Sequence, residues 1–142
     1  MTSPVAGLLG ESFAVLAAEL PAAHARMCAR LAGRRVDLRV DGERFVAAFD
    51  GGQASVRACA ADEEPAADVR VVTGRGAILA VIDAERSLAE AVIAGEVHVV
   101  GDLDRLVEAH LALVAYVHGA VRCPSFPALL GRFRAMKGVS DR

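Results

Sequence analysis

The chain has 142 residues, with 16 basic and 18 acidic side chains, three cysteines and no tryptophan. This is the usual length of one domain, and the spread, nearly balanced charge excludes the basic footprint of a nucleic-acid-binding protein. No uncharged stretch approaches the roughly 20 apolar residues that a membrane-spanning helix needs. The cysteines are odd in number and far apart, which disfavours a disulfide framework or a zinc site and favours a reducing cytoplasm. We therefore expect one cytoplasmic domain over 1–142.

The first 33 residues are predicted to be helical. Ser3 and Pro4 are typical of an N-cap and a first helical position. Pro21 interrupts the apolar periodicity and predicts either a kink or two helices in tandem. Gly33 is expected to close this helical segment, residues 1–33, as the residue after its C-cap. The apolar stripe advances by alternating steps of four and three and consists of Leu9, Phe13, Leu16, Leu20, His24, Met27 and Leu31.

Three strands are predicted next, as an antiparallel meander. Asp41-Gly42 and Gly51-Gly52 are two-residue hairpin turns. The first turn pairs Leu38 with Phe45, and the second pairs Phe49 with Ala54. Both pairings place apolar residues on the same face of the sheet. A slip by one residue in either turn would place polar residues on that face instead. The shared inner face consists of Val36, Leu38, Val40, Phe45, Ala47, Phe49, Ala54 and Val56.

A charged loop, Ala61–Ala67, leads to a fourth strand over Asp68–Thr73, whose inward residues are Val69 and Val71. A helix is expected over Ala77–Ala84. Ser87 and Glu90 then form the S-x-x-E pattern of a capping box, which predicts a short helix that ends at Gly95.

The C-terminal part predicts a fifth strand over Glu96–Gly101, with Val97 and Val99 inward. Asp102 is expected to cap a long helix that ends at Gly119. A last helix is expected within 126–138, roughly Pro127–Met136. The apolar stripe of the long helix is predicted to be Leu103, Leu106, Val107, His110, Leu111, Val114 and Val117.

This order of elements, together with the sequence from Asp68 to Asp102, resembles the sterol carrier protein 2 domain family. The most specific part is Ala94-Gly-Glu-Val-His-Val-Val-Gly-Asp102, where a glycine ends an apolar helix and alternating hydrophobic residues precede Gly-Asp. The resemblance covers about 36–119. It implies an α+β fold in which a five-stranded mixed sheet is covered by helices. It also implies an apolar tunnel for acyl chains, acyl thioesters or sterols.

Carried onto this sequence, the resemblance implies a tunnel wall from the sheet and from three helices. The last helix is amphipathic and basic, so it fits a lid over the tunnel, a contact with an anionic membrane, or simple docking on its own domain. The expected wall is Phe45, Phe49, Ile78, Leu79, Val81, Ile82, Leu88, Val92, Ile93, Leu103, Leu106, Val107, His110 and Leu111, and the expected lid is Phe126, Leu129, Leu130 and Phe133.

Few residues have side chains suited to catalysis, metal binding or anion binding. His110 fits a hydrogen bond to a lipid head group or an ordinary histidine at the core edge. His24 and Cys28 are spaced for a local pair, but no further metal ligand joins them. Thr73-Gly-Arg-Gly76 fits an anion site at a helix N-terminus or a flexible turn. Because no nucleophile–base set or metal motif is present, we expect no catalytic residue, no metal and no cofactor.

The sequence therefore favours a non-enzymatic domain that binds a hydrophobic lipid-like molecule, and transfer of that molecule stays open as a further activity. The alternative is an accessory or scaffold domain that presents a substrate to a biosynthetic enzyme or dimerises through its apolar helices. Transient contact with a membrane and formation of a homodimer also stay open. Neither nucleic-acid binding nor a transmembrane segment is expected.

Overall fold

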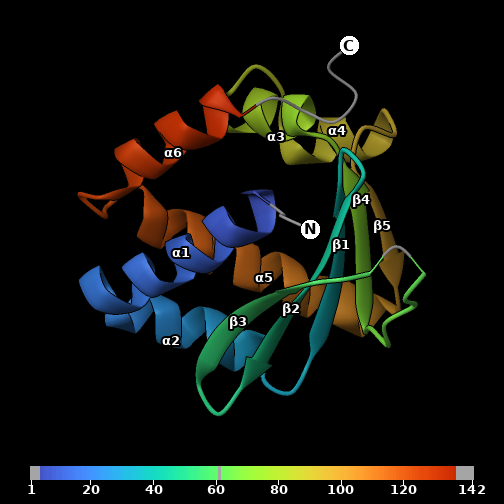
Figure 1. Cartoon of the computed structure of the whole chain (residues 1–142), viewed down its shortest axis with the longest axis horizontal. Coiled ribbons are helices and arrows are strands. Elements are labelled where there is room, and N and C mark those ends of the chain that lie inside the picture. Colours follow the sequence, from blue (N-terminus) through green and yellow to red (C-terminus); the bar gives the residue numbers. More distant parts are fainter. Residues whose placement is uncertain (1–3, 61, 137–142) are drawn as a thin grey trace.

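The protein is described here by a computed structural model covering residues 4–60 and 62–136. Its centre is a five-stranded mixed sheet in the order β3-β2-β1-β4-β5, with all helices on one side of it (Figure 1). The α+β fold class predicted from the sequence is confirmed. The strands are β1 (Arg35–Val40), β2 (Glu43–Asp50), β3 (Gln53–Ala58), β4 (Val69–Thr73) and β5 (His98–Gly101).

The predicted meander is confirmed in both registers. Leu38 pairs with Phe45, and Phe49 pairs with Ala54. Asp41, Gly42 and the two residues of the second turn all have positive φ, from 49° to 89°. This is the backbone of type I′ turns, which match the twist of a hairpin.

Two further strands complete the mixed sheet. β4 lies parallel to β1, and β5 pairs antiparallel with β4. Val69 is buried, and Val71 and Val99 pack against the core, as predicted. Val97 is buried just before β5, which begins two residues later than the sequence indicated.

The N-terminal helices are α1 (Pro4–Glu19) and α2 (Pro21–Arg30), so Pro21 separates two helices in tandem. Ser3, the expected N-cap, lies outside the described residues. α2 ends three residues before Gly33, whose φ of 74° places it in the turn that leads to β1. Leu16 of α1 is completely buried and belongs to the main core.

The long helix α5 (Leu103–Ala120) packs through small side chains, which the sequence analysis did not predict. Ala112 and Gly119 are its fully buried residues. A Cβ on Gly119 would lie 2.6 Å from Leu16 Cδ1 and 2.8 Å from Ala23 Cβ, so α5 approaches α1 and α2 too closely for any side chain there. Gly119 thus sits inside the helix as a close contact rather than ending it.

Because of this close packing, the face of α5 that points inward is not the face that was predicted. Leu103, Val107 and Val117 of the predicted inner stripe are exposed, and so is His110. The expectation that large residues point inward was wrong for these four because alanine and glycine occupy the tight interface. The inward residues also include Tyr116, whose hydroxyl lies 2.7 Å from Ser12 Oγ. Burial raises the pKa of this phenol.

The remaining helices lie near the end of the sheet at which β4 ends (Figure 1). They are α3 (Arg75–Ile82), α4 (Leu88–Ile93) and α6 (Phe126–Ala135). The predicted capping box is confirmed, with Ser87 N donating to Glu90 Oε1 at 2.8 Å and Glu90 N donating to Ser87 Oγ at 3.1 Å. Asp102 occupies the N-cap position of α5, although its side chain makes no capping hydrogen bond.

Candidate ligand-binding surface

The apolar face of α3 is closed at one end and open at the other. Ile78 and Leu79 are half-buried and pack against the cluster of Leu8, Leu129 and Phe133. One turn after Ile78, Ile82 shares that face but is 47% exposed. A large aliphatic side chain that faces its own domain and still contacts solvent indicates that the helical layer is incomplete there.

The short helix α4 continues this open area. Ala91 is fully buried, and its carbonyl accepts hydrogen bonds from the backbone amides of Glu96 and Val97. Its neighbour Val92 is 43% exposed, and Ile93 at the helix end is 86% exposed. Leu88 and, on α3, Val81 are half-buried.

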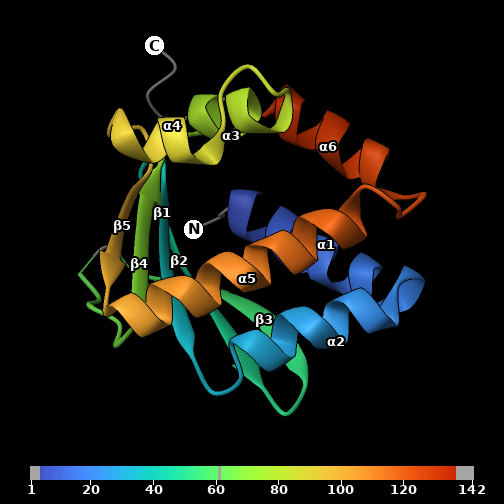
Figure 2. The same ribbon diagram turned by 180° about the vertical axis from the view of Figure 1, so that it is seen from behind.

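One flank of α5 faces the same region. Leu106 packs against the core near Gly101 of β5, and Leu113 lies two turns further on the same flank, 41% exposed. α2 lies on the opposite side of α5 from α3 and α4, as the two views in Figures 1 and 2 agree. Leu113 is absent from the predicted wall because the predicted stripe is centred on the outward face of α5. The spacing of seven from Leu106 would have identified it.

Several predicted wall residues lie elsewhere. Phe45 and Phe49 are buried in the core, and the Phe49 ring stacks edge-on against Phe13 with centroids 6.0 Å apart. Leu111 faces α2 and lines a shallow depression between the two helices. With Leu103, Val107 and His110 pointing outward, the candidate surface consists of Ile82, Leu88, Val92, Leu106 and Leu113, with Ile78, Leu79 and Val81 beside it.

The predicted lid, α6, is docked on its own domain. Leu129 and Phe133 are buried, and Phe126 and Leu130 are half-buried. Arg132 forms a two-bond ion pair with Glu11 of α1, at 2.5 and 2.9 Å.

At its other end, α6 is tied to α3 by Arg134 and Asp83. These arginines lower the pKa of the Glu11 and Asp83 carboxyls. The helix thus bridges α1 and α3 along the edge of the candidate surface.

Two depressions on the molecule lie away from α3 and α4. One, of about 680 Å³, lies between α2 and α5 and has Leu111, Val114 and Ala115 among its lining residues. The other, of about 390 Å³, lies on the outer face of the sheet beside Val46 and Arg57. Neither is lined by a residue of α3, α4 or α6.

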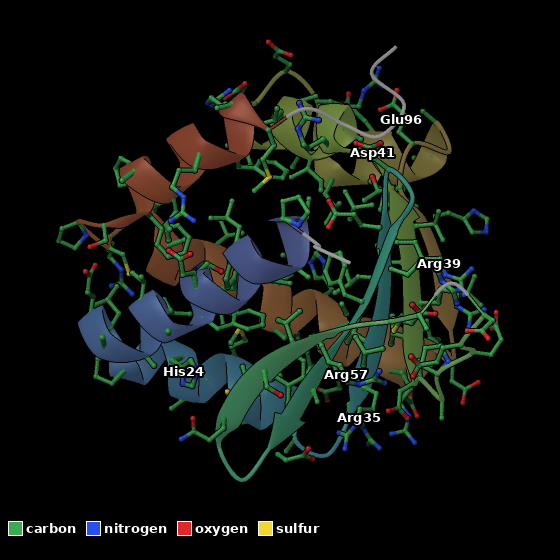
Figure 3. All side chains as sticks on the ribbon, in the orientation of Figure 1. His24, Arg35, Arg39, Asp41, Arg57 and Glu96 are labelled. Carbon is green, nitrogen blue, oxygen red and sulfur yellow. The ribbon has the colours of Figure 1, made fainter. Side chains whose placement is uncertain are left out.

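The outer face of the sheet is polar, which the sequence analysis did not single out. Asp37 is completely buried there, and its Oδ2 accepts from Arg70 Nε at 2.7 Å and from Arg39 Nη2 at 3.3 Å. Glu64, in the loop before β4, lies within 3.7 Å of both arginines. Figure 3 shows Arg39, Arg35 and Arg57 on this side, away from the helices. The ion pairs hold the charged loop against the sheet.

The alternatives for polar residues are also resolved in part. Asp41 Oδ2 accepts a hydrogen bond from Arg75 N at 3.0 Å, so the protein's own carboxylate occupies the N-terminus of α3 (Figure 3). Cys28 Sγ lies 3.7 Å from His24 Nε2, but burial raises the pKa of this thiol, which disfavours a thiolate–imidazole pair. Within residues 4–60 and 62–136, no group of three metal-ligating side chains occurs.

Comparison with known proteins decides the fold. No protein-family model matches the sequence, and no curated protein sequence matches it significantly. A solved structure titled UbiJ-SCP2 ubiquinone synthesis protein superimposes with a TM-score of 0.58 at 22% identity, covering 80% of this chain and 92% of that chain. The chain has the sterol carrier protein 2 fold.

A second solved structure agrees. The sterol carrier protein domain 2 of Helicoverpa armigera matches with a TM-score of 0.50 at 13% identity, over 64% of this chain and 74% of that chain. The sterol carrier protein 2 fold expected from Asp68–Asp102 is therefore confirmed. None of the helices in the described part of the chain is long and apolar enough to cross a membrane.

Proposed function

We propose that the protein binds a hydrophobic small molecule with a long apolar chain between α3–α4 and the facing flank of α5. The supporting observation is that Ile82, Val92 and Leu113 are exposed, although each lies on a helix whose neighbouring residues pack into the domain. Covering such side chains with an acyl, acyl thioester or sterol-like molecule removes apolar surface from water on both partners. Each buried CH₂ contributes about 0.8 kcal/mol.

The sterol carrier protein 2 fold supports this proposal, because two neighbours with that fold carry sterol carrier or SCP2 in their names. The binding step needs no catalytic group. We therefore propose a carrier and not an enzyme, with the apolar surface as the whole of its working site.

Native mass spectrometry of protein purified without detergent tests the proposal. We expect a co-purified lipid-like mass and saturable uptake of fluorescent fatty acyl or sterol probes. Ile82→Asp and Leu113→Asp should each weaken probe binding at least tenfold, because a carboxylate on this surface would be desolvated by the apolar chain.

Val100→Asp is the matched control. Val100 is 52% exposed on the outer face of the sheet, opposite the helices and paired in register with Arg70. The same chemical change there should leave probe affinity unchanged. Absence of both co-purified lipid and probe uptake in the wild-type protein would refute the proposed function.

A second candidate function is an accessory domain that presents a hydrophobic substrate to a biosynthetic enzyme. The observation that favours it is the match over most of its length to a protein named for ubiquinone synthesis. Under this proposal the bound molecule is a prenylated aromatic intermediate, and the protein co-purifies with a biosynthetic enzyme. Preferential binding of prenylated quinones over fatty acids would favour it, and the reverse preference would favour a general carrier.

Contact of α6 with a membrane has less support than docking of α6 on its own domain. Its apolar residues Leu129 and Phe133 face the domain, and Arg132 and Arg134 are paired with acids. A homodimer would use a different surface, which lies on α5.

A further inference from the structure

The outward face of α5 is apolar except for the exposed His110 at its middle. Leu103 and Val121 at the two ends are 75% and 77% exposed, and Val107 and Val117 between them are 48% and 45% exposed. All three charged residues of the helix, Asp104, Arg105 and Glu108, lie off this face. An α-helix of 18 residues is about 27 Å long, so this is an extended surface rather than an isolated side chain.

The spacing on this face has a particular order. Successive steps are four, three, four, three and four residues, which is the heptad spacing of helices that pack side by side. This sequence of steps reads the same in both directions. The stripe consists of Leu103, Val107, His110, Val114, Val117 and Val121.

A stripe that reads the same in both directions complements a second copy of itself lying antiparallel. With the two-fold axis at the middle of the helix, Leu103 faces the partner's Val121 and Val107 faces the partner's Val117. His110 then faces the partner's Val114. A closed two-fold dimer requires such self-complementarity, because the same patch is used on both subunits.

Charge is also complementary in this arrangement. Asp104 lies in the first turn of α5 and Arg122 directly follows its C-cap residue Val121, so an acidic and a basic side chain lie at the two ends of the stripe. Both are exposed. In the antiparallel pair, the acidic end of each helix lies beside the basic end of the other, whereas a parallel pair would place like charges together.

We propose that the protein forms a homodimer through antiparallel packing of α5 against α5 of a second copy. The depression between α2 and α5 adjoins the stripe through Val114, and it is also lined by Arg26, Arg30 and Arg34 of the neighbouring segment. A single helix pair is smaller than the usual interface of about 1,600 Å², so we expect a dissociation constant of about micromolar magnitude. The proposal does not depend on lipid binding, because Ile82 lies on α3 and Leu113 lies on the flank of α5 beside the stripe rather than in it.

Sedimentation equilibrium measures the mass as a function of concentration. We expect a dimer above about 50 µM, on the scale of a micromolar constant. Val107→Asp should shift the constant at least tenfold toward monomer, while the control Val100→Asp on the sheet should stay dimeric. Circular dichroism checks that both variants keep their helices. A wild-type protein that is monomeric throughout, or a Val107→Asp variant that remains dimeric, would overturn the proposal.

A charge exchange tests the orientation. Asp104→Arg alone should weaken the dimer, and Asp104→Arg combined with Arg122→Asp should restore it. In a Cys59→Ser background, a mixture of Val107→Cys and Val117→Cys proteins should form an intermolecular disulfide under mild oxidation. Cross-linking of either variant with itself, but not of the mixture, would contradict the antiparallel arrangement. Binding of a monomeric wild-type protein to anionic vesicles through Leu103 and Val121 would assign the face to a membrane instead.

Discussion

The two sides of α5 differ in how they meet the rest of the molecule. Toward α1 and α2, small residues allow close approach, and Leu16, Ala23 and Gly119 interlock with almost no solvent contact. Toward α3 and α4, Ile82 and Leu113 are large and remain exposed. The first side is a closed core, and the second has apolar surface that no residue within 4–60 and 62–136 covers fully. Burial, and not hydrophobicity alone, therefore separates the part of the helical layer that stabilises the fold from the part proposed to bind a ligand.

The largest expected effect lies in the closed half. Leu16 is completely buried, so Leu16→Ala should lower the free energy of unfolding by about 3 kcal/mol through lost burial and the cavity left behind. Ile82→Ala should cost less than about 1 kcal/mol, because this residue is nearly half exposed. Urea denaturation of both variants measures the contrast. Equal losses would remove the distinction between the two halves.

Glycine positions provide a second contrast. Gly119→Val should destabilise the protein by about 2 kcal/mol, because the new side chain overlaps Leu16 and Ala23. Gly131, in α6, has open space around an added Cβ. Gly131→Ala should therefore stabilise the protein by about 0.5 to 1 kcal/mol through helix propensity. Thermal unfolding followed by circular dichroism distinguishes the two, and a tolerated Gly119→Val would contradict the close packing of α5.

The capping box of α4 allows a smaller test within the open half. Ser87→Ala removes the hydrogen bond to Glu90 N and should cost about 1 kcal/mol. The loss should be local, because α4 has only one fully buried residue. Hydrogen exchange should accelerate at Ala91 and Val92 while the amides of Leu16 and its neighbours stay protected. Uniform acceleration across the protein would show that the open half unfolds only together with the core.

The smallest expected effect is a pH dependence of the contacts that hold α6. Arg132 and Arg134 lower the pKa values of Glu11 and Asp83 from their ordinary 4.5 and 3.8. A lowered folded-state pKa contributes stability above the unfolded-state value, and this contribution is lost as the pH falls through the folded-state value.

The double variant Arg132→Gln, Arg134→Gln should therefore be less stable than the wild type at pH 7. The difference between the two proteins should shrink at acidic pH, as the pH falls through the folded-state pKa values and both carboxyls become protonated. Urea titrations at neutral and at acidic pH measure this difference. A difference that is the same at both would show that the pairs do not stabilise the docked helix.

Most of the fold was predictable because local signals and long-range pairing agreed. Asp41-Gly42 and Gly51-Gly52 set two registers that place the same residues inward, and Pro21 and the Ser87–Glu90 pair mark helix ends. The orientation of α5 was not predictable from hydrophobicity, because both faces of that helix are apolar. Which of the two faces packs inward depends on the neighbouring helices. The close approach of Gly119 to α1 and α2 places the face that carries the alanine residues inward.

The predicted tunnel wall combines residues from different places in the fold. Ile78, Leu79 and Ile82 lie on one face of α3, while Phe45 and Phe49, also assigned to the wall, are in the core. A sheet residue with an inward side chain looks the same in sequence whether a helix or a ligand covers it. The charges around the buried Asp37 were missed because the covering loop and β4 come together only in the folded chain.

Mapping where an apolar ligand lies on the protein tests the proposed binding surface. A photoreactive fatty acyl probe would be cross-linked to the wild-type protein and the labelled peptides identified by mass spectrometry. We predict labels within 78–93 and 106–113, which are lost in the Ile82→Asp variant and retained in Val100→Asp. Labels confined to the α2–α5 depression or to the outer face of the sheet, or labelling that survives in Ile82→Asp, would contradict the assignment of ligand binding to the open half of the helical layer.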